Sequence, residues 1–331
     1  MFDNLGRIDM RTFGKLILAG VAIAALTIGA SSLAAKDAQP LKVEKPLVFK
    51  GLNQVVIGQF TVAYFTKKID YDGGGFLAAS NKGKAIGHLS GLSPTDFQGT
   101  TDAIYADFTK QLAERGITIV DSAGLVANKY YAKIKQEPQG EGIRVALKKE
   151  DHADAVAYWP MQLGRNDNAL VPMRMMDMNM GNTYTAQYDY ARTAKVPVLN
   201  VVYYVDFAKP AQSSLGGLLQ SIKVSAGLAV SQFGTQMALM DTTGKMSKIS
   251  LAVPIEEGGD FANIRETTSG VTKAVQIASV LGVFGRGSGK PLMASARFDY
   301  QVVDAKGYSD KAVSAANKAS DLFLRQIEAL R

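Results

Sequence analysis

The 331-residue chain has no cysteine and few histidines. The lack of cysteine excludes disulfides, thiolate metal sites, a cysteine nucleophile and a lipidated amino-terminal cysteine. His88 and His152 are the only histidines, although metal sites and acid–base catalysis favour this residue. Neither is accompanied by a Gly-x-Ser-x-Gly nucleophile elbow. We therefore predict no catalytic residue, and expect a protein that is not an enzyme.

Two ligand-binding motifs are present only in part. The stretch Gly285–Pro291 has the glycines and lysine of a phosphate-binding loop, but Phe284 replaces the first glycine and Pro291 the hydroxyl residue. The stretch is therefore interpreted as a flexible basic loop. Asp70 and Asp72 resemble the start of a calcium loop that lacks its later ligands. Neither motif predicts a cofactor.

The chain is basic, with a formal net charge of +7. No dense Lys/Arg block with interleaved aromatic residues occurs, so we expect no nucleic-acid partner. An exported basic protein can meet anionic lipid, lipopolysaccharide or cell-wall polymer. The alternative is that the charge serves solubility alone.

The amino terminus has the layout of a secretory signal. Arg7, Arg11 and Lys15 precede an uncharged run, Leu16–Ala35, which ends in small residues. We expect residues 1–35 to be a signal peptide and residues 36–50 a polar tether. The expected location is the periplasm or outer membrane of a Gram-negative bacterium. An uncleaved membrane anchor is the alternative, because the run approaches the roughly 20 apolar residues that span a bilayer.

Strand and helix patterns alternate in the first half of the chain, which predicts an α/β (α+β) fold with a layered mixed sheet and flanking helices. The second half predicts long β-hairpins, with turns at Asp241–Lys245 and Asp304–Gly307. We expect one domain over residues 51–331, with insertions at about 67–95 and 164–195. The predicted strands are Gln54–Thr66, Ile117–Val120, Val156–Leu163, Val196–Phe207, Leu228–Met240 and Ser295–Val303, and the predicted helices are Thr101–Gly116, Ser122–Lys135, Ser269–Leu281 and one from Ser309 to the end.

Five methionines gather between residues 173 and 180. Thioethers are soft ligands that suit Cu(I), and three of the five would share one side of a strand. The alternative is a flexible apolar edge that packs against a partner or a neighbouring subunit. The candidate copper ligands are Met173, Met175, Met176, Met178 and Met180.

The strand after the Asp241–Lys245 turn alternates apolar and polar residues. Its apolar side predicts either a wall that faces lipid or a subunit, or one face of a half-buried sheet. The candidate contact residues are Ile249, Leu251, Val253 and Ile255.

The order of elements resembles the periplasmic α/β domain of the curli secretion channel family and the related amino-terminal domain of TolB. The resemblance rests on Val55–Phe65, the helix ending Leu112–Gly116, the strand Ile117–Asp121, and the later strand, Asp241–Lys245 turn and terminal helix. Channel members of that family form rings, and each subunit lends β-hairpins to a shared outer-membrane channel. This chain departs from them in lacking the lipidated cysteine, which favours a soluble periplasmic role.

These features favour a non-enzymatic envelope protein that acts in assembly or secretion through binding and oligomerisation, with a ring as one form. Its expected partners are other copies of itself and other envelope proteins. One alternative is a periplasmic binding module for a small ligand or Cu(I). Another is an enzyme whose carboxylates or glycine loop meet only in the folded chain.

Overall fold

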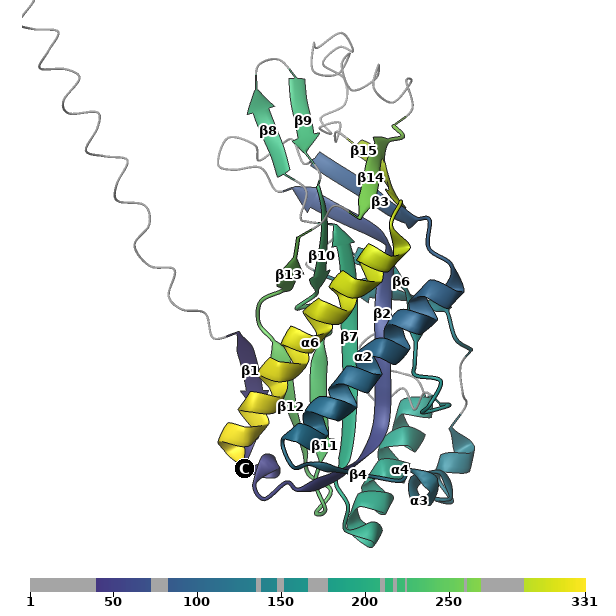
Figure 1. Ribbon diagram of the computed structural model, residues 1–331, viewed down its shortest axis with the longest axis vertical. Coiled ribbons are helices and arrows are strands. Elements are labelled where there is room, and N and C mark those ends of the chain that lie inside the picture. The colour runs from purple at the N-terminus through teal and green to yellow at the C-terminus, as the bar shows by residue number, and fades with distance from the viewer. Residues whose placement is uncertain are drawn as a thin grey trace, which may run out of the picture. The chain divides into compact units, whose positions relative to one another are not determined.

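The computed structural model describes residues 40–72, 83–134, 138–147, 152–165, 178–208, 212–216, 219–223, 225–258, 261–268 and 295–331. They belong to one compact unit, Pro40–Arg331. A large mixed sheet carries helices on its two faces (Figure 1), which confirms the predicted α+β class. The predicted signal peptide 1–35, the predicted helix Ser269–Leu281 and the predicted loop Gly285–Pro291 lie outside the described residues.

Two long parallel strands, β2 (Gln54–Asp72) and β7 (Val198–Ala208), form the middle of the sheet. Every residue of β7 is buried. A continuous run of β-branched and aromatic residues is what a strand covered on both faces requires. The core therefore lies on both sides of this pair of strands.

The other described strands extend the sheet on either side of that pair. The main path runs β1-β12-β11-β7-β2-β3-β15-β14, while β10 and β13 join beside β7, and β4, β5 and β6 beside β2. Two further strands, β8 (Gln212–Gly216) and β9 (Leu219–Lys223), form a separate hairpin. The remaining bounds are β1 Leu41–Glu44, β3 Gly83–Ser90, β4 Thr118–Val120, β5 Glu141–Ala146, β6 His152–Tyr158, β10 Ala226–Val230, β11 Gln236–Met240, β12 Met246–Leu251, β13 Ile255–Glu257, β14 Ala262–Glu266 and β15 Ser295–Val302.

Two long helices, α2 (Pro94–Glu114) and α6 (Ala305–Leu330), lie side by side over one face of the sheet (Figure 1). The helix α4 (Met178–Ala194) covers the other face, together with the short α3 (Ala123–Val126) and the 3₁₀ turn η2 (Tyr131–Lys133). The core is therefore divided into two clusters, one on each face of the sheet. Alternation along β2 explains this division, because Val56 packs under α4 while its neighbours Val55 and Ile57 join the larger cluster.

The two strand–helix units β3–α2 and β15–α6 run in the same direction. β3 and β15 pair in parallel, and each is followed by a capped helix. Ser93 accepts from the Asp96 amide in a capping box, with Pro94 at the first helical position, and Asp304 accepts from the Gly307 amide. The cap at Ser93 explains why α2 begins earlier than the predicted Thr101. The cap at Asp304 shows that Asp304–Gly307 begins the helix α6 and does not form the predicted hairpin turn.

Several segments differ from the sequence-based expectation. β2 continues to Asp72 and β3 follows it, where an insertion was expected. Residues 41–49, expected to be a tether, form β1 and the 3₁₀ turn η1 (Pro46–Phe49). β1 pairs with β12, and Phe49 is fully buried. The predicted strand Leu228–Met240 is divided into β10 and β11, because a turn containing Gly234 interrupts it.

A β-bulge at Gly58 is built into β2. The register with β7 shifts between Ile57 and Gln59, and the buried Arg165 guanidinium donates to the carbonyls of Ile57 and Gly58 at 2.7 and 2.8 Å. Beside the bulge, Gln187 of α4 and Asn200 of β7 form a buried reciprocal amide pair at 2.9 and 2.8 Å. A bulge leaves ladder carbonyls without strand partners, and Arg165 supplies donors to them.

We predict that Gly58→Ala destabilises the fold. A Cβ there would lie 2.6 Å from Asn200 Oδ1, Gln187 Nε2 and Val198 Cγ1, so the amide pair must separate. The expected loss is about 2 kcal/mol or more in the free energy of unfolding. Gly99→Ala in α2 is the control: no atom lies within 4 Å of its Cβ position, and it should stabilise by about 0.5–1 kcal/mol. Urea unfolding measures both, and equal effects would contradict the packing argument.

Candidate functional site

The central sheet divides into two layers where β2 and β7 part. Their pairing ends at Tyr64 and Val205. Beyond this point β3 takes the place of β7 beside β2, while β10 pairs with the opposite edge of β7. The top of β7 then packs against β15, with the Phe207 and Tyr300 rings 5.0 Å apart. We call this place the sheet fork. It lies at the carboxyl ends of two parallel strands, where α/β proteins commonly place their sites.

A buried ion pair joins the two sides of the sheet fork. Lys68 Nζ of β2 lies 2.7 Å from Asp206 Oδ2 of β7, and their side chains are only 9% and 13% exposed. Lys68 also donates to the Ala208 carbonyl at 3.0 Å, and Asp206 Oδ1 accepts from the Ala208 amide at 3.1 Å. The charges are therefore compensated, as burial of charge demands.

Two tyrosines lie close to the sheet fork: Tyr64 of β2 contacts the first turns of α2, and Tyr308 belongs to the first turn of α6. The Tyr64 hydroxyl donates to the Phe97 carbonyl at 3.2 Å and lies 2.9 Å from Thr101 Oγ1. The Tyr308 hydroxyl is buried and has no hydrogen-bond partner in the described part of the chain. Burial raises the pKa of Tyr308 well above its usual value, and Tyr64 and Asp206 add to the effect. The hydroxyl therefore stays protonated as a donor.

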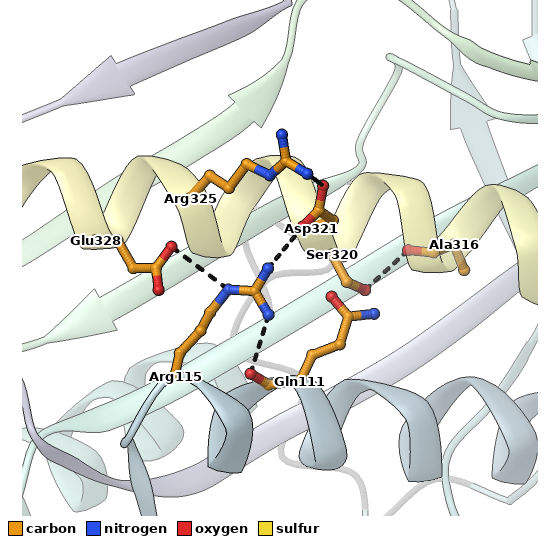
Figure 2. Close-up of polar contacts among 7 residues, drawn as sticks. All are labelled: Gln111, Arg115, Ala316, Ser320, Asp321, Arg325 and Glu328. Atoms are coloured by element: carbon orange, nitrogen blue, oxygen red, sulfur yellow. Dashed lines mark hydrogen bonds and ion pairs between the residues drawn. The ribbon is translucent and has the colours of Figure 1, made fainter.

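A second polar cluster, the helix seam, joins α2 to α6. Figure 2 shows Arg115 between Asp321, 2.6 Å away, and Glu328, 3.6 Å away. Arg115 also donates to the Gln111 carbonyl at 3.1 Å. One turn back, Asn317 donates to Asp107 at 2.6 Å. These contacts lock two parallel helices in one register and show no feature that favours chemistry.

Hairpin connections gather at one end of the sheet. β2, β5, β7 and β14 all run toward this end, and β3, β6, β10 and β15 return from it. We call it the hairpin end. The isolated pair β8–β9 connects β7 to β10 here (Figure 1). Among the described strands, β8 and β9 pair only with each other, so each leaves one backbone edge open.

The structure places Met178 and Met180 in a helix and not on a strand. They lie in the first turn of α4, whose repeat differs from the two-residue alternation of a strand. The predicted shared strand side therefore does not exist for these two. Met173, Met175 and Met176 lie outside the described residues. Within the described part of the chain, no group of three or more His, Asp or Glu side chains could hold a metal ion.

The predicted contact strand belongs largely to the protein's own core. Ile249 is fully buried and Leu251 is 4% exposed, because β12 is flanked by β1 and β11. Val253 and Ile255 are half-buried, and Ile255 begins the separate strand β13. Of the two interpretations, the half-buried sheet face describes Ile249 and Leu251, which are not free to meet lipid or a subunit.

The two histidines lie on different neighbours of β2. His88 of β3 is the register partner of Lys67, and His152 of β6 is the partner of Ile69. Partial burial, and then the charge of Lys67, lower the pKa of His88 below its usual value. The histidines stand on opposite sides of the β2 strand and do not share a site.

Helices of the described ranges are either too short or too polar to cross a membrane.

Comparison with known proteins finds no match to a family model, to a curated protein or to a solved structure.

Sequence reasoning did not find Lys68, Asp206, Tyr308 or Arg165. Lys68 and Asp206 carried a weak signal, because each places a charge within or beside an otherwise apolar strand. Their sequence separation of 138 hides the pairing. Tyr308 and Arg165 offered no signal, since their surroundings come from distant strands.

We predict strong coupling between Lys68 and Asp206. Lys68→Met or Asp206→Asn alone should each lower the free energy of unfolding by about 3–5 kcal/mol, since each leaves a buried charge without its partner. The double variant should lose much less than the sum. The exposed Lys110–Glu114 pair, 3.9 Å apart, is the control and should couple by about 0.5 kcal/mol or less. Additive effects at Lys68 and Asp206 in urea unfolding would contradict the role of the pair.

We predict opposite effects on stability when the hydroxyls of Tyr308 and Tyr64 are removed. Tyr308→Phe removes a buried hydroxyl that has no partner and should raise the free energy of unfolding by about 1 kcal/mol. Tyr64→Phe removes bonded contacts and should lower it by a similar amount. Thermal and urea unfolding of both variants make the comparison. If Tyr308→Phe destabilises as Tyr64→Phe does, the Tyr308 hydroxyl is held by a bound water or ligand.

Proposed function

We propose that this chain is an exported envelope protein that acts without catalysis, in assembly or secretion, by associating with other copies of itself and with other envelope proteins. The observation that carries the proposal is the β8–β9 hairpin at the hairpin end. An isolated two-stranded hairpin is marginally stable in water. Its open backbone edges can pair with strands of another chain.

The construction of the rest of the hairpin end supports the same role. β7 and β10 hold the base of β8–β9 at the register pair Ala208 and Ala226. Asp206 and Lys68 fasten that base to β2. A hairpin fixed at a rigid base is positioned before it meets a partner, which lowers the ordering cost of association.

The order of elements, which resembles the curli secretion channel family, and the signal-like amino terminus motivate the envelope location. The members of that family that form channels associate through hairpins, which supports association of this chain through the hairpin end. The proposed location is the periplasm or the periplasmic side of the outer membrane. A ring is the closed form that head-to-tail association takes when its rotation closes.

We predict that removing β8–β9 abolishes self-association without unfolding the protein. Residues 209–225 can be replaced by Asn-Gly, because Ala208 and Ala226 are antiparallel register partners that a two-residue turn can join. The full-length chain is expressed in a Gram-negative host, the cells are fractionated, and particle mass is measured by light scattering. The parent protein should form a multimer in the envelope fractions, and the variant a monomer with an unchanged circular-dichroism spectrum.

The matched control replaces the turn at the opposite end of the sheet. Met240 and Met246 are also register partners, so Asn-Gly can replace Asp241–Lys245 in the same way. This control should keep the parent mass. A parent protein that is monomeric at every concentration, or that stays in the cytoplasm, would overturn the proposal.

A further inference from the structure

The side of helix α4 that faces away from the core carries aromatic and basic residues at regular intervals. Thr183, Ala186, Gln187, Tyr190 and Ala191 point inward. On the outer side, aromatic and basic residues follow at helical spacing, because positions four apart share a face. These outer residues are Tyr184, Tyr188, Arg192 and, just past the helix, Lys195.

The outer side chains of α4 support one another. The Tyr184 and Tyr188 rings are stacked with centroids 6.1 Å apart. The Arg192 guanidinium lies 5.2 Å from the Tyr188 ring, and one of its nitrogens donates to the Tyr188 hydroxyl at 2.7 Å. The Tyr188 ring in turn packs on Gly244, where any Cβ would clash with it. Arg192 is therefore held in place and still has donors free for a ligand.

The neighbouring segment between α3 and η2 extends this surface with the same chemistry. Lys129 and Lys133 lie 4.9 and 5.6 Å from the Tyr130 ring centroid. The segment is tied to α4 by the Asn128–Asp189 bond at 2.7 Å and by the Asn182 bond to the Lys133 carbonyl at 3.3 Å. We call the combined surface the α4 surface: Lys129, Tyr130, Lys133, Tyr184, Tyr188, Arg192 and Lys195.

Basic side chains outnumber the acids on and around the α4 surface. Lys129, Lys133, Arg192 and Lys195 are all exposed. Two acids lie nearby and accept from neutral donors: Asp189 from Asn128, and Asp121 from the Ala123 amide at 2.5 Å. Among the described residues no ion pair joins the four cations to an acid, and the four outnumber the two carboxylates, in a chain whose net charge is +7. Such a surface attracts anions over a distance of about one Debye length, roughly 10 Å.

We infer that the α4 surface docks on an anionic phospholipid membrane. Tyrosine and basic side chains together suit the headgroup region, where rings sit at the boundary and Lys or Arg meet phosphate. The cations already lie over the Tyr130 and Tyr188 rings, so those rings are poor platforms for stacking a sugar or a base. The surface lies at the end opposite the hairpin end (Figure 1), and the inference does not rest on the proposed self-association.

The test is flotation of the full-length protein with vesicles. Vesicles of phosphatidylcholine containing phosphatidylglycerol should carry the protein up, and pure phosphatidylcholine vesicles should carry much less. Each basic residue near an anionic surface contributes about fivefold in affinity, so Lys129→Gln, Lys133→Gln and Arg192→Gln together should weaken binding about a hundredfold. Added salt should weaken the binding of the parent protein as well.

The matched control removes three charges from the opposite face of the sheet. Lys110→Gln, Lys306→Gln and Arg325→Gln lie on α2 and α6 with side chains 73%, 84% and 70% exposed. This control should bind as the parent does, apart from a small loss of net charge. Both triple variants keep the amino-terminal segment, so any contribution it makes to binding cancels. Thermal melts confirm that both are folded.

Three results would overturn the inference: equal loss in the two triple variants, no preference of the parent for phosphatidylglycerol, or binding to soluble polyphosphate without binding to vesicles. The variant that lacks β8–β9 should still prefer phosphatidylglycerol. A monomeric parent that binds these vesicles would therefore reject the proposed self-association and keep the membrane surface.

Discussion

The parallel pairing of β2 and β7, closed at its upper end by the Lys68–Asp206 ion pair, is the constraint on which the other elements depend. Parallel strands buried on both faces need helices on each side, and α2, α6 and α4 supply them. Where the pairing stops, β2 and β7 would expose backbone edges to the core. β3 takes over the edge of β2 that β7 leaves, β10 pairs along the opposite edge of β7, and the ion pair holds the two layers together at the point where they part.

The parallel pairing of β3 and β15 explains why polar residues lie between α2 and α6. The helices follow parallel strands, so they run in the same direction and their N-terminal ends lie together. Four fully buried alanines of α6, at 312, 315, 316 and 319, allow close approach. Small apolar side chains do not by themselves define how far one helix is shifted along the other, and the polar groups of the helix seam fix this position. Arg115 makes the largest number of these contacts, because it binds two carboxylates and a carbonyl.

The elements that the sequence predicts best are those with a strong local pattern. β7 and the first part of β2 are apolar runs with β-forming residues, and the Asp241–Lys245 turn has its own Asp-amide bonds, with Asp241 Oδ1 accepting from Thr243 and Lys245 at 2.8 Å each. Local patterns fail where tertiary contacts decide. β1 is a short mixed segment that becomes a strand only because β12 offers it a partner. Met178 and Met180 looked strand-like by alternation, yet α4 forms because Ala186, Tyr190 and Ala191 bury one helical side.

The candidate site could not be predicted for the same reason. Lys68 reads as a solvated residue at a strand end until β7 brings Asp206 beside it. The bulge at Gly58 is equally hidden, since its partner Arg165 is far away in the chain. What the sequence does contain is the composition of the outer surfaces: the tyrosines and cations of α4 are visible at helical spacing once the helix is known. Predicting a buried polar site therefore requires knowledge of the fold, whereas predicting a row of side chains on a helix surface requires only the correct periodicity.

The two ends of the sheet differ in how they can bind, and the difference follows from their backbones. At the hairpin end, open strand edges offer main-chain donors and acceptors, which suit another polypeptide. On α4 the main-chain groups of the helix interior are satisfied within the helix, so the helix offers side chains for contact, and its outer ones are basic and aromatic. A helix face cannot be extended by strand addition, and the side chains of this one favour phosphate. Because β7 runs from α4 directly to the base of β8–β9, one rigid strand connects the two kinds of surface. A chain docked through α4 would therefore present its hairpin away from that membrane, where neighbouring copies could reach it.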